Sequence, residues 1–184
     1  PGTDGFTVEF FKFFWADVGK IILKGLNEAY EDKELSAVQK QGIITCIPKE
    51  DCDRTLLKNW RPITLLNVIY KMASGCIANR IKKVIPVLIG NEQKGFIKGR
   101  YIGENIRIIY DVMNEAMEQD MMGLLLLVDF EKAFDSISRK FINKSLNYFG
   151  FGDSFINWVT TLNKKANACI IQNGYKSEFF PVLR

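Results

Sequence analysis

The feature that most restricts the fold of this 184-residue chain is a run of hydrophobic residues, Leu124 to Val128, which ends at Asp129. It is the longest purely hydrophobic run in the sequence, whereas a membrane-spanning helix needs about 20 such residues. The run is also too short for a buried helix, and a glycine and an acidic residue bound it. It therefore predicts a buried β-strand over residues 123–130, and no membrane segment is expected.

Most of the remaining sequence has the periodicity of amphipathic helices. The clearest case is residues 67–88, where hydrophobic residues recur every three or four positions and Asn67 is a candidate N-cap. Thr7 is a candidate N-cap for the first of four further helices. Those helices are expected at residues 6–30, 104–119, 138–149 and 153–165.

Short β-branched runs predict two more strands, at residues 42–48 and 63–66. The chain closes with an expected hairpin, in which Asn173 and Gly174 form a type I′ turn. Strands and helices mix without strict alternation, so the predicted fold class is α+β.

The sequence contains no histidine, which excludes Ser-His-Asp and Cys-His triads and His-ligated zinc. Its four cysteines form no CxxC pair, so neither a zinc knuckle nor a disulfide framework is expected. The net charge of +4 conceals thirteen bases and five acids at residues 37–110, followed by seven acids and one base at residues 111–135. This pattern suits an anionic partner beside a cation site, although solvated helix faces explain charge counts alone better.

Asp129 is the first candidate functional residue because it ends the expected strand. Active sites of open α/β sheets gather at that edge, and Asp135 follows six residues later, beyond a turn. Carboxylates suit Mg²⁺, which takes oxygen ligands. Taken alone, an aspartate after a strand is more often the cap of a turn.

Two further segments carry candidate cations. Lys49 follows one expected strand and Arg61 precedes the next, so pairing of these strands would carry both cations toward one face, as a triphosphate requires. The glycine-punctuated segment GNEQKGFIKGRYIG interleaves basic and aromatic residues that suit nucleic acid: Lys94, Phe96, Lys98, Arg100 and Tyr101. Taken singly, a solvated basic loop explains the first segment better than a triphosphate site does. An ordinary glycine-rich turn between helices explains the second, so its signal alone is weak.

In this order, the segments resemble the reverse transcriptase domain of non-LTR (LINE-type) retrotransposons over the whole chain. The family's N-terminal element is similar to PGTDGFTVEFF, and its fingers motifs are similar to IPK and NWRPITLLNVIYKMASGCIANRI. The segment after them is similar to NEQKGFIKGRYIGENI, and the first palm motif is similar to LLLLVDFEKAFDSI. The approach to the next palm motif is similar to NACIIQNGYKSEFFPVLR. Five elements in register make the resemblance specific.

The resemblance implies an incomplete polymerase right hand, with a fingers-like region at residues 1–121 and the N-terminal part of the palm at residues 122–184. The implied function is that of a fragment of an RNA-directed DNA polymerase, which adds dNTPs by two-metal phosphoryl transfer in the full-length protein. The family's later palm motifs, including its aspartate pair, are expected beyond Arg184. We therefore expect this chain by itself not to polymerise DNA.

The resemblance also implies residue roles. Asp129 would be the first metal ligand, beside the carbonyl of Phe130, and Asp135 belongs to the same motif. Phe134 would stack under the incoming sugar and exclude a 2′-hydroxyl. The implied cofactor is Mg²⁺ or Mn²⁺, and the implied substrate is a dNTP.

Further roles concern the nucleotide and the template. Lys49 and Arg61 would hold the triphosphate, and the template backbone would lie near Lys94, Lys98 and Arg100. The implied partners are an RNA template and a DNA primer, in an intracellular protein of nucleus and cytoplasm. Endonuclease and thumb regions would belong to the full-length element protein.

Two other functions fit part of the sequence. A non-catalytic nucleic-acid-binding remnant would bind RNA in a salt-dependent way, without dependence on Mg²⁺ or dNTP. An unrelated Mg²⁺ phosphotransfer domain would need alternating βα units and more acids near an early strand, which the helix-rich N-terminal half does not supply.

Overall fold

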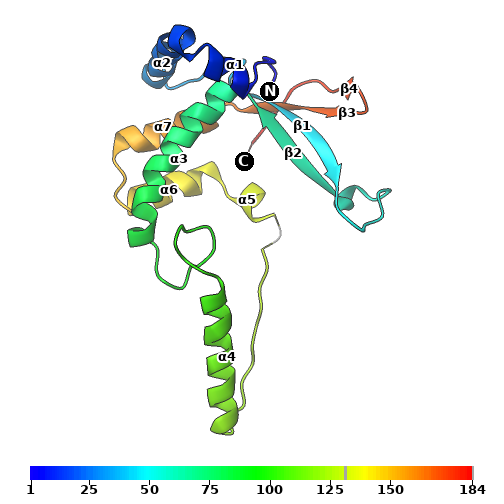
Figure 1. Cartoon of the computed structure of the whole chain (residues 1–184), viewed down its shortest axis with the longest axis vertical. Helices are drawn as coiled ribbons and strands as arrows, with labels where there is room; N and C mark the ends of the chain where they lie inside the picture. The colour runs from blue at the N-terminus through cyan, green and yellow to red at the C-terminus, as the bar shows by residue number, and fades with distance from the viewer. Residues whose placement is uncertain (131, 184) are drawn as a thin grey trace. The chain divides into compact units, whose positions relative to one another are not determined.

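The computed structural model describes residues 1–130 and 132–183, without the side chain of Phe134. The chain forms two compact units (Figure 1). The first unit comprises Pro1–Ile77 and Ile137–Arg184, and the second comprises Ala78–Ser136. The mixture of helix and sheet agrees with the predicted α+β class. The boundary expected between residues 121 and 122 concerns polymerase subdomains and stays a prediction.

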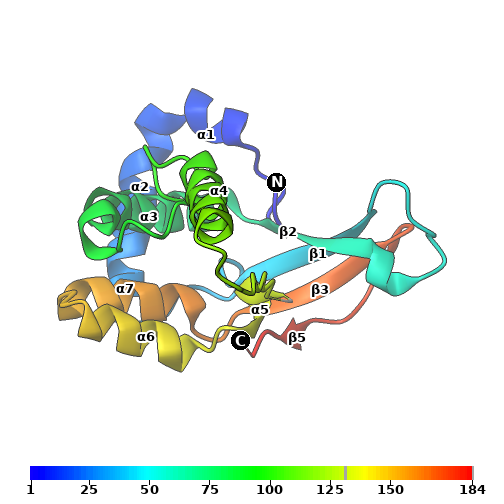
Figure 2. The same ribbon diagram turned by 90° about the horizontal axis from the view of Figure 1, so that it is seen from below.

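A mixed sheet lies in the first unit. Its strand order is β2-β1-β3-β4, and β5 also pairs with β3. Strands β1 and β2 are antiparallel, whereas β1 and β3 lie side by side in parallel (Figure 2). The strands are β1 (Gln41–Pro48), β2 (Trp60–Leu66), β3 (Asn167–Gln172), β4 (Tyr175–Lys176) and β5 (Phe180–Pro181).

Strand β2 begins at Trp60, earlier than the expected start at Ile63. It therefore includes Pro62, which pairs with Cys46 of β1. Proline donates no backbone hydrogen bond, and it is tolerated here because β2 is the outer strand in the sheet order.

The turn between β3 and β4 is the expected two-residue hairpin. Asn173 has φ 52° and Gly174 has φ 81°. Gln172 and Tyr175 pair directly on either side of them. Positive φ at both central positions is what a type I′ turn requires, so the prediction from Asn-Gly is confirmed.

The helices match most of the expected ranges. Residues 6–30 are the main exception, because the helix breaks at Phe14, whose φ and ψ are −94° and 17°. Thr7 is confirmed as the N-cap, since its hydroxyl accepts a hydrogen bond from the Phe10 N–H at 3.3 Å. The helices are α1 (Val8–Phe13), α2 (Trp15–Glu31), α3 (Val68–Leu88), α4 (Gly103–Glu118), α5 (Ala133–Ser136), α6 (Arg139–Tyr148) and α7 (Asp153–Asn163). No helix within the described residues is long and hydrophobic enough to cross a bilayer.

The core of the first unit lies among α2, the start of α3, and α7. Its buried members are Ala29, Leu35, Ala73, Ile77 and Leu162. At its border, Tyr30 stacks on Trp158 with ring centroids 5.1 Å apart. Such a pair stabilises a fold by about 1 kcal/mol beyond the area that it buries.

Asn67 joins the N-terminal segment to the start of α3. It is 1% exposed, and its amide nitrogen donates to the carbonyl of Val38 at 2.9 Å. Its amide oxygen accepts from the backbone N–H of Asp4 at 3.4 Å. Asn67 directly precedes α3, and its carbonyl accepts the hydrogen bond of Lys71 at 3.1 Å. The side chain thus fixes a distant segment of chain beside the helix start.

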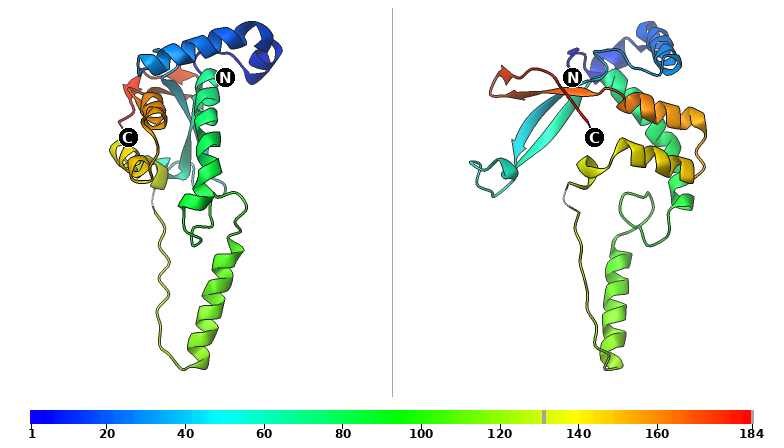
Figure 3. Two further views of the ribbon diagram at one scale, coloured as in Figure 1. Left: turned by 90° about the vertical axis from the view of Figure 1, so that its left-hand side faces the viewer. Right: turned by 180° about the vertical axis from the view of Figure 1, so that it is seen from behind.

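The expected buried strand at residues 123–130 is wrong. Both views in Figure 3 show residues 121–130 as an extended chain after α4, and these residues have no regular secondary structure. Every hydrophobic side chain from Leu124 to Val128 is at least 53% exposed. A strand needs a neighbouring strand to bond its backbone, and among the described strands none pairs with this segment.

Three lysines surround Glu34 in the first unit. The nitrogen atoms of Lys40, Lys165 and Lys164 lie 2.6, 3.1 and 3.4 Å from its carboxylate. Hydrogen bonds from these lysines, from Lys40 above all, lower the pKa of Glu34 from 4.5 to about 2. The cluster ties the segment after α2 to the segment between α7 and β3.

We expect Glu34 to make the stability of the chain depend on pH. Because its pKa is lower in the folded state, it stabilises the fold above pH 4.5, and this contribution disappears as the pH falls toward 2. Urea unfolding of the parent and of Glu34→Gln should therefore differ at pH 6 and converge near pH 2. Glu28→Gln is the control, because the carboxylate of Glu28 pairs with one lysine at 3.9 Å. A difference between parent and Glu34→Gln that does not change with pH would contradict the expectation.

Candidate functional site

The antiparallel pair of β1 and β2 brings two predicted cations onto one face. Arg61 pairs directly with Ile47, and the N–H of Lys49 donates to the carbonyl of Asn59 at 2.8 Å, which extends the ladder past β1. Side chains in a ladder alternate between faces, and directly paired residues share a face. Lys49 and Arg61 therefore lie on the same face at the loop end of the hairpin.

The loop that joins these strands is ordered by its own hydrogen bonds. One carboxylate oxygen of Asp53 accepts from the hydroxyl of Thr55 at 2.7 Å and from its N–H at 2.9 Å. These bonds hold the pKa of Asp53 below its ordinary value. A 3₁₀ turn, η1 (Leu57–Asn59), leads into β2. The loop is thus a preformed connection, which the spacing of Asp53 and Thr55 signals in the sequence.

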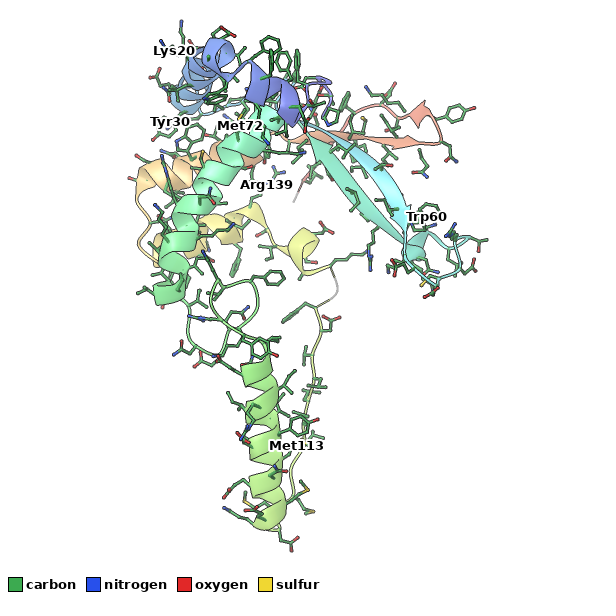
Figure 4. The ribbon with its side chains drawn as sticks, viewed as in Figure 1. Lys20, Tyr30, Trp60, Met72, Met113 and Arg139 are labelled. Carbon is green, nitrogen blue, oxygen red and sulfur yellow. The ribbon has the colours of Figure 1, made fainter. Side chains whose placement is uncertain are left out.

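Trp60, the first residue of β2, holds the loop through its side chain. Its indole N–H donates to the carbonyl of Arg54 at 2.9 Å. Figure 4 shows Trp60 at the loop end of the hairpin, where the loop enters β2. This contact sets the position of the loop beside Arg61, and no pattern in the sequence signals it.

The acidic candidates lie in the second unit. Asp129 and Phe130 belong to the exposed segment without regular structure, and Phe130 is 77% exposed. Asp135 lies in the short helix α5, where its N–H donates to the carbonyl of Lys132 at 3.0 Å. The side chain of Phe134 lies outside the part of the chain that the structure describes, so its expected role stays a prediction.

The oxygen atoms of these acidic residues are of the type that a hard divalent cation binds. Mg²⁺ takes oxygen ligands, and Asp129 with the neighbouring carbonyl offers them. Across the described residues, no three His, Cys, Asp or Glu side chains gather as a metal-binding group. Since Mg²⁺ usually binds through one or two carboxylates, substrate phosphates and water, the donors present are compatible with it but do not enclose it.

Arg100 organises the segment between α3 and α4. Its guanidinium donates to the carbonyl of Pro86, in the last turn of α3, at 2.9 Å and to that of Ile89, just after the helix, at 2.8 Å. It also donates to the carbonyls of Gly90 and Gln93 in the loop that follows. Cationic side chains often satisfy the last carbonyls of a helix. No pattern in the sequence points to this contact, because Arg100 follows the last residue of α3 by twelve positions.

The other two predicted template cations differ in their surroundings. Lys94 forms an ion pair with Glu104, and its side chain is only 12% exposed. Lys98 is exposed, and within the described part of the chain it forms no ion pair. Of the three cations, Lys98 is therefore the one whose ammonium group is open to a ligand.

Comparison with known protein families shows to which family the chain belongs. A family model described as "Reverse transcriptase (RNA-dependent DNA polymerase)" matches residues 47–182, which is more than half of the chain. The chain belongs to the reverse transcriptase family. The match includes every residue for which a catalytic or binding role was expected.

Curated relatives of this reverse transcriptase chain are proteins of mobile elements. It is 33% identical over 172 residues to the "Transposon TX1 uncharacterized 149 kDa protein" of Xenopus laevis, which covers 94% of the chain. It is 27% identical over 116 residues, or 63% of the chain, to a Pol polyprotein from the type-1 retrotransposable element R2 of Popillia japonica. The chain spans 13% and 16% of these two relatives. The resemblance to LINE-type reverse transcriptases is thus confirmed.

Proposed function

We propose that this chain supplies the fingers and the beginning of the palm of an RNA-directed DNA polymerase, an incomplete right hand, in which Lys49 and Arg61 hold the triphosphate of the incoming dNTP. The observation that carries the proposal is the position of both cations on one face of the β1–β2 hairpin. A lysine acts on phosphate as a point charge, and an arginine adds a bidentate fork.

The ordered loop strengthens this assignment. The Asp53–Thr55 bonds and the Trp60–Arg54 bond hold the end of the hairpin before any ligand arrives. Preorganised groups bind a ligand with a smaller loss of conformational freedom than mobile ones. The hairpin end can therefore present two cations to a triphosphate in a fixed arrangement.

Asp129 would hold a divalent cation, Mg²⁺ or Mn²⁺, together with the carbonyl of Phe130. With two such ions bound, one would activate the hydroxyl of the primer and the other would neutralise charge on the triphosphate. Asp135 would add negative charge to the same motif, and Phe134 would contact the sugar. An RNA template and a DNA primer are the partners in this proposal, and other parts of a longer protein would complete the catalytic centre.

Replacing either hairpin cation tests the proposal. In a longer protein that contains this chain and the rest of the polymerase domain, Lys49→Ala and Arg61→Ala should each lower kcat/KM for dNTP by about tenfold or more, because each removes a charge-assisted contact to phosphate. Most of the change should appear in KM. Steady-state incorporation on a primed RNA template measures both constants. Lys58→Ala, an exposed lysine of the same loop, is the matched control.

Two results would overturn the assignment. Equal kinetics for Arg61→Ala and Lys58→Ala would remove the hairpin from the nucleotide site. A longer protein that binds RNA yet incorporates no dNTP would favour the non-catalytic nucleic-acid-binding function instead.

A further inference from the structure

A cavity of about 110 Å³ lies between helices α6 and α7, which lie side by side in the first unit (Figure 2). Of the residues that the structure describes, no acidic one lines it. Two hydrophobic residues complete a lining that is otherwise made of cations and uncharged hydrogen-bonding residues: Arg139, Asn143, Thr160, Asn163 and Lys164. A hollow lined by one sign of charge attracts ligands of the opposite sign, so this lining favours an anion.

Arg139, the first residue of α6, carries a charge that the described part of the chain does not neutralise. It forms no ion pair there. One terminal nitrogen of its guanidinium donates to the carbonyl of Val182, whereas its buried Nε has no hydrogen-bond partner among the described residues. A buried donor without a partner costs free energy, and an arginine without a counter-ion retains its affinity for an oxyanion. An anion in the adjoining cavity would neutralise this charge.

Lys164, the C-cap of α7, shares its carboxylate partner with two other lysines. Its Nζ lies 3.4 Å from the carboxylate of Glu34, whereas those of Lys40 and Lys165 lie closer, at 2.6 and 3.1 Å. One carboxylate cannot neutralise three ammonium groups, so positive charge remains in excess. Of these three lysines, Lys164 alone lines the cavity, and the excess charge is therefore available to a ligand there.

Two asparagines bring uncharged donors to the same cavity. The amide of Asn143 donates to the hydroxyl of Thr160 at 3.1 Å, and the amide of Asn163 donates to the carbonyl of Val159 at 2.8 Å. An amide nitrogen carries two N–H groups, and within the described residues the second one of each asparagine forms no hydrogen bond. The donors come from both helices, which suits the several acceptor oxygens of a phosphate group.

The size of the cavity separates a phosphate group from a water molecule. A volume of 110 Å³ is several times the roughly 15 Å³ that one water requires. A water would also accept one hydrogen bond without neutralising either cation. An oxyanion supplies both the acceptors and the negative charge.

We propose that the cavity between α6 and α7 binds one phosphate group. Arg139 and Lys164 would supply the charge, and the amides of Asn143 and Asn163 would supply the further donors. None of these residues belongs to the β1–β2 hairpin or to the acidic motif, so the inference goes beyond the proposed function and does not depend on it. Inorganic phosphate and the phosphates of a polynucleotide present the same chemistry to the site.

Isothermal titration calorimetry of this chain with inorganic phosphate tests the site. The parent should bind one phosphate with saturation. Lys164→Met should weaken binding by about tenfold, because it removes a charge-assisted contact. Lys165→Met is the matched control: it removes the same charge from the same lysine cluster but lies outside the cavity lining, and it should change the affinity little. Both variants leave Glu34 with two lysine partners.

A neutral substitution separates the shape of the site from its charge. Asn143→Leu should also weaken phosphate binding, because it removes a donor and places a hydrophobic side chain in the cavity without altering the net charge. Arg139→Gln should abolish binding. Since Arg139 also holds the carbonyl of Val182, circular dichroism checks that this variant is folded, and the variants of Lys164 and Asn143 decide the matter if it is not.

Fluorescence anisotropy with a 20-nucleotide RNA identifies the source of the phosphate group. At constant ionic strength, competition by inorganic phosphate, together with weaker RNA binding by Lys164→Met than by Lys165→Met, would identify a polynucleotide. Saturable phosphate binding that leaves RNA binding unchanged would identify free phosphate. Either result supports the site.

Two results would overturn the inference. The parent chain would show no saturable binding of phosphate, or Lys164→Met and Lys165→Met would weaken it equally, which would reduce the effect to net charge. Neither result bears on dNTP incorporation, which the variants of Lys49 and Arg61 test separately.

Discussion

Asp129→Asn, in a longer protein that completes the polymerase domain, should lower the rate of dNTP incorporation by about a hundred- to a thousandfold. This is the loss typical of removing one preorganised electrostatic group from a catalytic centre. Asparagine keeps the shape of the side chain and one oxygen but removes the charge that attracts a divalent cation. Single-turnover incorporation on a primed RNA template, with Mg²⁺ and separately with Mn²⁺, measures the effect.

Stability should not obscure this result, because Asp129 is exposed and lies outside the helices and strands. RNA binding by Asp129→Asn should equal that of the parent protein. Asp120→Asn is the matched control: Asp120 is another exposed acid of the second unit, and asparagine tolerates its φ of 53°. If Asp120→Asn and Asp129→Asn slowed incorporation equally, Asp129 would have no special role in catalysis.

Local patterns predicted the helices and the final turn because their causes are local. The hydrophobic period of α3 and the Asn-Gly pair before β4 each act over a few residues. Partners distant in sequence were harder to find. The parallel pairing of β1 with β3 joins Gln41 to Asn167, and hydrophobic period contains no information about such a partner.

The wrong strand at residues 123–130 has the same origin. The hydrophobic run from Leu124 has the composition of a strand. Whether it forms one depends on a second strand that can pair with its backbone, and the composition of the run says nothing about such a partner. The site was predicted in the same uneven way. The spacing of Lys49 and Arg61 predicted that both lie on one face if their strands pair, and the strands do pair. Arg100 was expected at the template, because composition does not reveal that its guanidinium donates to backbone carbonyls.

The second large effect concerns Gly2, the buried glycine of the PGTDG segment. A Cβ atom at this position would lie 1.9 Å from the amide oxygen of Asn67 and 2.4 Å from its backbone nitrogen. The backbone of Asn67 cannot yield easily, because it joins β2 to α3. The N-terminal segment must move instead and would lose the bond from the Asp4 N–H to Asn67.

Gly2→Ala should therefore lower the free energy of unfolding by about 3 kcal/mol, the upper part of the range for overpacking a buried site. Urea unfolding followed by circular dichroism measures the change. Gly25→Ala is the matched control, since it lies inside α2 with nothing within 4 Å of its added Cβ atom. That substitution should raise stability by about 0.5–1 kcal/mol, because alanine restricts the unfolded chain and favours helix. Opposite signs for the two variants would locate the effect in the contact with Asn67, whereas equal stability of Gly2→Ala and the parent would show that the N-terminal segment does not pack there.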